Sequence, residues 1–383
     1  MRVLVTGGAG FIGSHVVDAY VAAGHEVVVV DNLSTGRRAN VNPAATFYRL
    51  DLYSSHLDGL FRFHAFDVVN HHAARVNVRR SMEDPMRDIA INVGGTIRLL
   101  ELCRRHRVRG VIFASSGGAI YGDQSPAPTP EDAVPRPASP HGISKMASEG
   151  YVDYYRTVHG LPAVVLRYAN VYGPRQDLHG EAGIVADFCN HLLDGQVPVV
   201  CGDGEQTRDF VYVGDVALAN LRALDLLERQ GINGNGLGIF NIGTGQETTV
   251  NALLASLADL ASCTATPLYL PPRVAEQRRS ALDPARARAA LGWAPATPLR
   301  EGLLLTLEWF ERSPAADETR NEERSRDHEE RSNVRTFESS LVPVGAPSGG
   351  EVAAPAPRAD IAGPSNSVVV HGERSNGRTI ERL

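Results

Sequence analysis

The chain has 383 residues and a formal net charge of −6, with 43% hydrophobic and 21% charged residues. This length is sufficient for two lobes, and the composition is that of an ordinary soluble globular protein. There is no basic excess, which argues against a nucleic-acid partner. No run of about 18 apolar residues occurs, so we expect no membrane span and a cytoplasmic protein. The four cysteines are scattered without a CxxC pair, which predicts neither a disulfide framework nor a metal site.

Short β-branched runs alternate with longer helical patterns over roughly the first 170 residues. This alternation is typical of parallel βαβ units, so we predict an α/β fold with a Rossmann-type doubly wound parallel sheet. The expected strands are Arg2–Thr6, Glu26–Val30, Thr46–Leu50, Asp67–Asn70, Gly110–Ala114 and Ala163–Arg167, and the expected helices are Phe11–Ala23, Asp84–Arg105 and Gly142–Val158.

The second part of the chain has shorter elements. We interpret residues 174–312 as a smaller α/β substrate-binding lobe, some segments of which return to the first domain, residues 1–173. Residues 313–383 contain one almost wholly polar stretch and another rich in Pro, Gly, Ala and Ser. They bury too little apolar area to offset the entropy of ordering, which predicts a disordered polar tail. The expected elements are a strand at Asp209–Tyr212 and helices at Gly183–Leu193, Asp215–Arg229, Val250–Ala261 and Leu299–Glu311.

Three glycines, Gly7, Gly10 and Gly13, form a GxxGxxG pattern between the first expected strand and the first expected helix. Glycines there permit a tight turn and close approach of the backbone to a pyrophosphate, which the helix N-terminus stabilises. Asp31 ends the second expected strand, 18 residues after Gly13. A carboxylate at that place accepts hydrogen bonds from the adenosine ribose and repels a 2′-phosphate. We therefore predict that residues 1–173 form a domain that binds NAD in preference to NADP.

A series of motifs follows the order found in a known family. They are Thr6–Ser14, Asp31–Gly36, Asp51–Leu52, His71–Ala74, Asn92–Thr96 and Ser115–Gly122. Together they resemble the motifs of NAD-dependent nucleotide-sugar epimerases and dehydratases of the extended short-chain dehydrogenase family, most of all the UDP-glucose 4-epimerases. The resemblance covers roughly residues 1–312. It implies that NAD contacts Gly7, Gly10, Phe11, Ile12, Gly13, Asp31, Asn32, Asp51, Leu52, Ala73, Ala74, Asn92, Ser115 and Lys145.

The resemblance also implies an acid/base pair. In the family, a tyrosine takes the proton of the sugar 4-hydroxyl while hydride passes to NAD, and a lysine four residues later lowers the pKa of the tyrosine. Lys145 occupies the lysine position, but His141 occupies the tyrosine position. One interpretation is that His141 is the acid/base, kept neutral at pH 7 because Lys145 and NAD are positively charged. The other is that the site is slow or inactive, because imidazole is shorter than phenol.

The serine-rich stretch departs from the family pattern as well. Many relatives carry Ser or Thr four residues before the tyrosine of a Tyr-Gly pair, and that position is Gly117 here. Ser116 is the nearest hydroxyl and is expected to meet the sugar 4-oxygen, with Ser115 as a stand-in. Related 4,6-dehydratases and decarboxylases carry Asp or Glu in this stretch, whereas Gly117-Gly118-Ala119 has no carboxylate. The sequence therefore favours 4-epimerisation over elimination or decarboxylation.

Four residues resemble those that hold the nucleotide-sugar in the family. Asn170 would meet the phosphate or the sugar, and Arg208 and Arg273 the pyrophosphate, because guanidinium groups bind phosphate oxygens in pairs. Glu276 would meet the ribose, although the family Arg-Pro-Gly turn reads Arg-Val-Ala here. These residues predict a nucleotide-sugar substrate, in family terms a UDP-sugar.

The leading hypothesis is an NAD-dependent UDP-hexose 4-epimerase with a variant acid/base. The alternatives are a catalytically impaired protein that binds NAD and a sugar nucleotide, and a dehydratase or oxidoreductase of a specialised pathway. The resemblance also implies a homodimer, in which the helices Asp84–Arg105 and Gly142–Val158 form a four-helix bundle with their copies. We expect Leu99, Cys103, Met146 and Tyr154 to face that interface.

Overall fold

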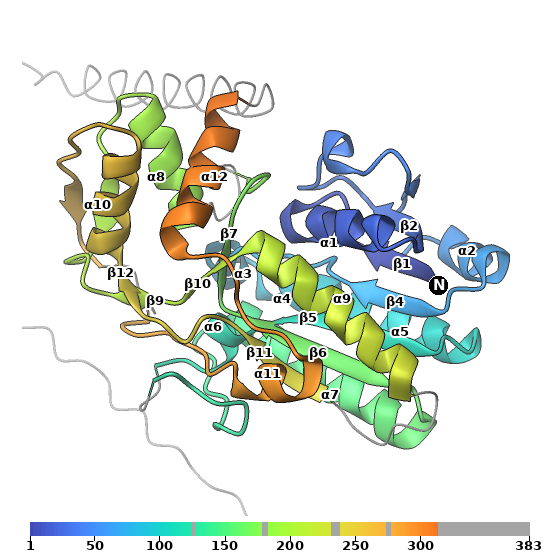
Figure 1. Cartoon of the computed structure of the whole chain (residues 1–383). Helices are drawn as coiled ribbons and strands as arrows, with labels where there is room; N and C mark the ends of the chain where they lie inside the picture. Colours follow the sequence, from blue (N-terminus) through green and yellow to red (C-terminus); the bar gives the residue numbers. More distant parts are fainter. Residues whose placement is uncertain (124–126, 178–182, 231–237, 273–276, 313–383) are drawn as a thin grey trace, which may run out of the picture. The chain divides into compact units, whose positions relative to one another are not determined.

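A seven-stranded, wholly parallel sheet forms the centre of the computed structural model (Figure 1). The structure describes residues 1–123, 127–177, 183–230, 238–272 and 277–312, all within the unit Met1–His328. The strand order is β11-β6-β5-β4-β1-β2-β3. The strands are β1 (Arg2–Thr6), β2 (Glu26–Asp31), β3 (Thr46–Arg49), β4 (Val68–His71), β5 (Gly110–Ser116), β6 (Ala163–Tyr168) and β11 (Gly238–Ile242).

The order of the strands reverses between β1 and β4, which is the point where doubly wound sheets bind ligands at their carboxyl ends. The predicted Rossmann-type sheet is therefore confirmed, and six of its strands begin within one residue of their expected positions. The sequence analysis missed β11, which extends the sheet beyond β6 although it follows β6 by 70 residues. Residues 313–383, where the tail is predicted, lie outside the described residues.

Helices cover both faces of the sheet. On one face, Val16, Val17 and Tyr20 of α1 join the same core cluster as α9 and Trp293. On the other face, Leu57 and Phe61 of α2 pack in a second cluster with residues of α5 and α7. These helices are α1 (Phe11–Ala22), α9 (Val213–Gln230) and α11 (Ala285–Leu291) on the first face, and α2 (His56–His64), α5 (Gly95–Arg105) and α7 (Pro140–His159) on the second.

The expected helix Asp84–Arg105 is interrupted by a π-helical turn. It consists of α4 (Pro85–Ile89), the π-turn η2 (Ala90–Gly94) and α5, and it is preceded by α3 (Val78–Glu83). A π-turn contains more residues than an α-helical turn, so it rotates the residues that follow it about the helix axis. Leu99 and Cys103 of α5 are only 2% and 0% exposed and belong to the second core cluster. The expectation that they face a dimer partner was therefore wrong.

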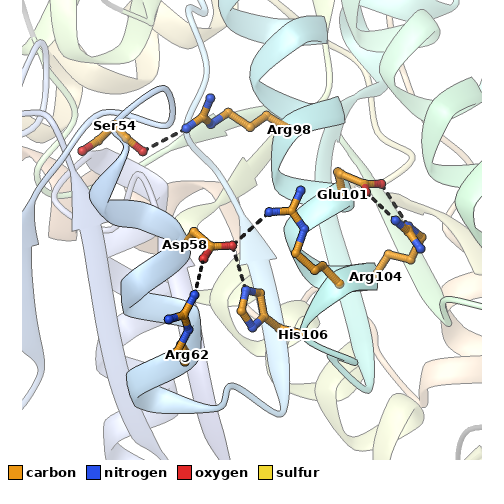
Figure 2. Close-up of polar contacts among 8 residues, drawn as sticks. Ser54, Asp58, Arg62, Arg98, Glu101, Arg104 and His106 are labelled. Carbon is orange, nitrogen blue, oxygen red and sulfur yellow. Dashed lines mark hydrogen bonds and ion pairs between the residues drawn. The ribbon is translucent and has the colours of Figure 1, made fainter.

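A charged cluster fastens α2 to α5 at the surface (Figure 2). Asp58 of α2 accepts hydrogen bonds from Arg62, Arg105 and His106, at 3.2, 3.1 and 3.0 Å. The histidine and arginine partners hold the pKa of the Asp58 carboxyl below its usual value. Because the cluster is exposed to solvent, we expect it to orient α5 rather than to add much stability.

A third core cluster lies among α8, α10 and α12, which Figure 1 shows side by side. None of the helices in the described ranges is long and apolar enough to cross a bilayer. The remaining elements are η1 (Arg38–Asn40), α6 (Gly117–Ile120), β7 (Asn170–Tyr172), α8 (Ile184–Leu193), β8 (Val199–Cys201), β9 (Thr207–Arg208), β10 (Phe210–Tyr212), α10 (Val250–Leu260), β12 (Thr248–Thr249), β13 (Leu268–Leu270) and α12 (Leu299–Arg312).

Candidate active site

The turn between β1 and α1 leaves no room for a side chain at Gly7 or Gly13. Gly7 has a φ of 71°, and a Cβ atom there would lie 2.6 Å from the backbone nitrogen of Ala73. A Cβ atom on Gly13 would collide with the carbonyl oxygen of Gly7. Gly10 precedes Phe11 and Ile12, which open α1, and its N–H donates to the Gly7 oxygen at 3.1 Å. The turn therefore lets a diphosphate approach the backbone and the positive end of α1.

Asp31 lies beside this turn at the end of β2. Its Oδ2 accepts from Ala9 N at 3.1 Å, and its Oδ1 accepts from Leu33 N at 2.8 Å. Asn32 donates to Asp51 Oδ2 at 2.9 Å, which ties the ends of β2 and β3 together. Each oxygen of Asp31 retains a lone pair for a ribose hydroxyl. The glycine turn, Asp31 and Asp51 thus fit an adenine dinucleotide without a 2′-phosphate. Leu52, predicted to contact NAD, is buried in the second core cluster.

We expect the chain to bind NAD about 100-fold more tightly than NADP. Asp31 would repel the 2′-phosphate of NADP and would lose its hydrogen bond to the ribose 2′-hydroxyl, which the phosphate replaces. The Asp31→Ser variant should reduce this preference to less than about tenfold, since serine is uncharged. Titration calorimetry with both cofactors measures the ratio. Asp18 of α1, whose carboxylate pairs with Arg175 at 2.8 Å, gives the control Asp18→Ser, which should keep the preference. Equal affinity of the natural chain for both cofactors would contradict this reading of Asp31.

Two histidines at the end of β4 have lowered pKa values: His71, the buried last residue of the strand, and His72, the half-buried residue that follows it. His71 contacts the hydroxyls of Thr6 and Thr96 through Nδ1 and Nε2, at 2.7 and 3.1 Å. His72 Nε2 lies 3.1 Å from the Tyr168 hydroxyl. Burial, with a contribution from the Lys145 charge, lowers the pKa of each imidazole to about 3. The loop then continues through Ala73 and Ala74, the residues predicted to lie under the cofactor, and Ala73 N donates to Thr6 Oγ1.

The helix α7 presents His141 and Lys145 on one face. Ser139 caps the helix by accepting from Gly142 N at 3.2 Å, and Pro140 fills the first position, where no N–H is needed. This cap fixes where α7 begins and so places His141 in its first turn. Lys145 follows one turn later, as the spacing of four residues predicts.

The imidazole of His141 is almost completely buried, with 5% of the residue exposed. Its Nδ1 lies 3.1 Å from the carbonyl oxygen of Arg75. Because a carbonyl only accepts, Nδ1 carries the proton and Nε2 has a free lone pair. Burial first, and then the charge of Lys145, lower the pKa of His141 to about 4. The direction of this shift agrees with the expectation of a neutral His141, although burial contributes more than the charge of Lys145.

Lys145 is held against the sheet beneath the site. Its Nζ donates to the carbonyl oxygen of Ala114 at 2.8 Å and lies 5.0 Å from the centre of the Phe113 ring. Burial lowers the pKa of Lys145 to about 8, although the Glu149 and Asp88 carboxylates act in the opposite direction. The amine is therefore mostly charged at pH 7 but close to its titration range.

The two serines at the end of β5 have different partners. Ser115 donates to Glu149 Oε1 at 2.6 Å, so its hydroxyl proton points into a buried ion pair. Ser116 caps α6 by accepting from Ala119 N at 3.2 Å, which leaves its own proton for another acceptor. A Cβ atom on Gly117 would lie 2.5 Å from Leu282 Cδ1, so a hydroxyl residue there would require Leu282 to move. The geometry therefore favours Ser116 over Ser115 as the hydroxyl that meets a substrate.

Two of the four residues predicted to hold a nucleotide-sugar lie in the described part of the chain. Asn170 begins β7, and its Oδ1 lies 3.8 Å from the position of a Cβ atom on Gly118, next to the serine stretch. Arg208 in β9 donates through Nη1 to the carbonyls of Thr207 and Gln277, at 2.7 and 2.8 Å. Arg273 and Glu276 lie outside the described residues.

Comparison with known proteins adds to this geometry. The sequence matches the NAD dependent epimerase/dehydratase family over residues 3–243. The UDP-glucose 4-epimerase of Mycolicibacterium smegmatis is 44% identical over 315 residues, 81% of this chain and 98% of that protein. The crystal structure of UDP-glucose 4-epimerase from Thermotoga maritima with UDP-glucose superimposes with a TM-score of 0.78, at 46% identity over 82% of this chain and 99% of that one. The Thermus thermophilus UDP-glucose 4-epimerase in complex with NAD gives 0.76, at 43% identity over 82% and 100%.

Proposed function

Because the chain belongs to the NAD-dependent epimerase/dehydratase family, we propose that it is a UDP-hexose 4-epimerase that acts by transient oxidation at C4. The UDP-glucose 4-epimerases among its relatives support this substrate class. In this proposal, residues 1–173 form the NAD-binding domain and residues 174–312 the substrate lobe, from which α9 and β11 return to the sheet. Asn170 and Arg208, with Arg273 and Glu276, would hold the UDP-sugar.

Three residues of the chain have separate roles in the proposed reaction at C4. NAD, when bound, supplies the oxidant for the C4 carbon and the reductant that restores it. His141 accepts the proton of the 4-hydroxyl at Nε2 and returns it after the keto-sugar has turned over in the site. Ser116 donates a hydrogen bond to the 4-oxygen, and Lys145 contributes a positive charge to the site. The other cofactor contacts come from the glycine turn, Asp31, Asn32, Asp51, Ala73, Ala74 and Ser115, with Asn92 supporting the loop after β4.

The single observation that carries the proposal is the state of His141. A buried, neutral imidazole with Nδ1 bound to a carbonyl offers its Nε2 lone pair as a base. A pKa of about 4 also makes this base weaker than an ordinary histidine, which is the observation that favours the second candidate, a protein that binds NAD and a sugar nucleotide without turnover. The missing carboxylate at Gly117–Ala119 argues against elimination in either case.

The direct test is to incubate the NAD-loaded protein with a panel of UDP- and dTDP-sugars and follow the configuration at C4 by NMR. We expect UDP-glucose and UDP-galactose to interconvert. Binding of UDP-sugars without inversion of any member of the panel would reject the epimerase and support the binding protein. Formation of a 4-keto-6-deoxy sugar would instead identify a dehydratase.

We also propose a homodimer formed through α4 and α7, which contact each other within the chain. Met86 and Ile89 of α4 and Ile143, Met146 and Tyr154 of α7 expose large apolar surfaces. Such a surface is suited to helix packing with a second copy.

We expect sedimentation velocity to show a dimer at micromolar concentration. The Ile143→Asp variant should raise the dimer dissociation constant at least about 100-fold, because a carboxylate would be buried in the interface. Phe63 of α2 is also apolar and exposed, so Phe63→Asp is the control that should leave the dimer intact. A monomeric natural chain would overturn the proposal.

A further inference from the structure

Asp88 is a buried carboxylate that the proposed reaction does not use. It lies on α4, one residue from the end of that helix and its π-turn, and is 0% exposed. Its Oδ2 accepts from Ser144 Oγ at 2.7 Å, and its Oδ1 accepts from Asn92 Nδ2 at 3.0 Å. No arginine or lysine forms an ion pair with it in the described part of the chain. The charge of Lys145 interacts with Asp88 only from beyond ion-pair distance, so burying this carboxylate carries a cost that an ion pair does not offset.

Asn92 connects Asp88 to the loop after β4. Its Oδ1 accepts from Arg75 N at 2.7 Å, and its Nδ2 donates to Arg75 O at 2.9 Å. The two protons of Nδ2 thus go to Arg75 O and Asp88. A flipped amide would place its oxygen against these two acceptors, so the amide orientation is fixed. The backbone oxygen of Asn92 accepts from Thr96 and Ser148, which holds the π-turn itself in place. Both backbone groups of Arg75 are therefore fixed by one side chain that Asp88 orients.

The same Arg75 carbonyl accepts the hydrogen bond of His141 Nδ1. We propose that Asp88 is a positioning residue for His141, acting through Asn92 and the backbone of Arg75 to hold the imidazole as the Nδ1–H tautomer with Nε2 unprotonated. The inference rests on the proposed function only for the catalytic use of Nε2. In many enzymes a second group hydrogen-bonds one ring nitrogen of a catalytic histidine, which fixes its tautomer and orients the other nitrogen toward the substrate.

The charges around His141 agree with this arrangement. Lys145 disfavours the protonated imidazole, whereas Asp88 favours it and so limits the lowering of the His141 pKa. The guanidinium of Arg75 donates to the Asp84 carbonyl, whereas the backbone carbonyl of Arg75 accepts from the His141 ring. Asp88 therefore supports the imidazole in both states of a proton transfer, by geometry when it is neutral and by charge when it is protonated.

The tautomer can be measured without turnover. Long-range proton–nitrogen NMR spectra of the NAD-loaded protein, labelled with ¹⁵N-histidine, distinguish Nδ1–H from Nε2–H. The signals of His141 are assigned by their loss in His141→Ala. We expect the natural chain to show Nδ1–H, and Asp88→Asn to shift the tautomer ratio toward Nε2–H by about tenfold, because one buried charge-assisted hydrogen bond is lost.

Ser144→Ala is the matched control. It removes a hydrogen bond of comparable length to Asp88 but leaves the path through Asn92 and Arg75 complete, so the tautomer should remain Nδ1–H. A natural chain with Nε2–H would overturn the proposal even if Asp88→Asn failed to fold. An unchanged ratio in folded Asp88→Asn, or an equal shift in Ser144→Ala, would also overturn it.

Turnover separates this inference from the proposed function. If the natural chain inverts C4, Asp88→Asn should lower kcat about tenfold with little change in KM, because the base is misaimed while the binding residues are intact. If no sugar is inverted but the tautomer results hold, the positioning role stands and the epimerase assignment fails. If C4 inversion is normal and the tautomer is insensitive to Asp88, the epimerase assignment stands and the positioning role of Asp88 fails.

Discussion

Replacing His141 with alanine is expected to reduce C4 inversion by at least about 10²–10⁴-fold, the range that a positioned general base contributes. In the proposal His141 accepts the 4-hydroxyl proton at Nε2, and its removal leaves no group one turn before Lys145 to accept that proton. The measurement is kcat with a UDP-hexose on NAD-loaded protein. His159, an exposed histidine on the same helix, gives the control His159→Ala, which should retain full activity.

The pH dependence follows from the direction of the pKa shift. The folded pKa of His141 is about 4, below its ordinary value of 6.5, so the imidazole is neutral and able to accept a proton throughout the pH range above that. Activity should therefore be steady from neutral pH downward and decline only as the pH approaches the folded pKa, by about tenfold per pH unit below it. An acid limb centred near the ordinary pKa would mean that the ring is more solvated than its burial indicates.

His141→Tyr separates the two candidate functions. It recreates the Tyr-Lys pair of the family, and a phenol must ionise to act as the base, so the acid limb should move to higher pH. An active natural chain should keep or increase its turnover, provided the phenol ring fits where the imidazole lies beside the Arg75 carbonyl. A natural chain that binds without turnover should become active only in this variant. Equal activity of the natural chain and His141→Ala would remove His141 from the mechanism altogether.

Local patterns in the sequence predicted the elements that form the cofactor site. The strand β1, the glycine turn and α1 depend on neighbouring residues, and so does the spacing from His141 to Lys145. Their positions agree because each signal is contained within one βαβ unit or one helical turn. The strand β11 lacks such a local signal, since its five residues become a strand by pairing with β6 far upstream.

The partners of the predicted site residues could not be found from the sequence. Arg75 contacts His141 through its backbone carbonyl, and a carbonyl has no residue identity to recognise. The π-turn at Ala90–Gly94 changes which residues of α5 face the core, and the spacing of apolar residues in the sequence does not predict this turn. Asp88 is followed by Asn92 and opposed by Ser144, but only the folded chain shows that these three meet away from solvent. Contacts between distant segments decide these features.

A second buried group, Glu149, was missed for the same reason and has a large expected effect on stability. On α7, one turn after Lys145, it forms an ion pair with Arg167 of β6 at 2.6 Å and accepts from Ser115 at 2.6 Å. The side chains are 7% and 6% exposed. Arg167 also donates to the Tyr121 hydroxyl, which in turn donates to Asn241. The pair thus joins α7 to β5 and β6 beneath the serine stretch.

Glu149→Gln is expected to lower the free energy of unfolding by about 3–5 kcal/mol, because it leaves the Arg167 guanidinium buried without a counter-charge. Urea unfolding followed by circular dichroism measures the change. Asp153 on the same helix pairs with Arg156 at 2.8 Å but is 50% exposed, so Asp153→Asn should cost less than about 1 kcal/mol. In an Arg167→Met background the loss of Glu149 should cost much less than in the natural chain, since no charge is left unpaired. Equal costs for Glu149→Gln and Asp153→Asn would show that burial does not govern these ion pairs.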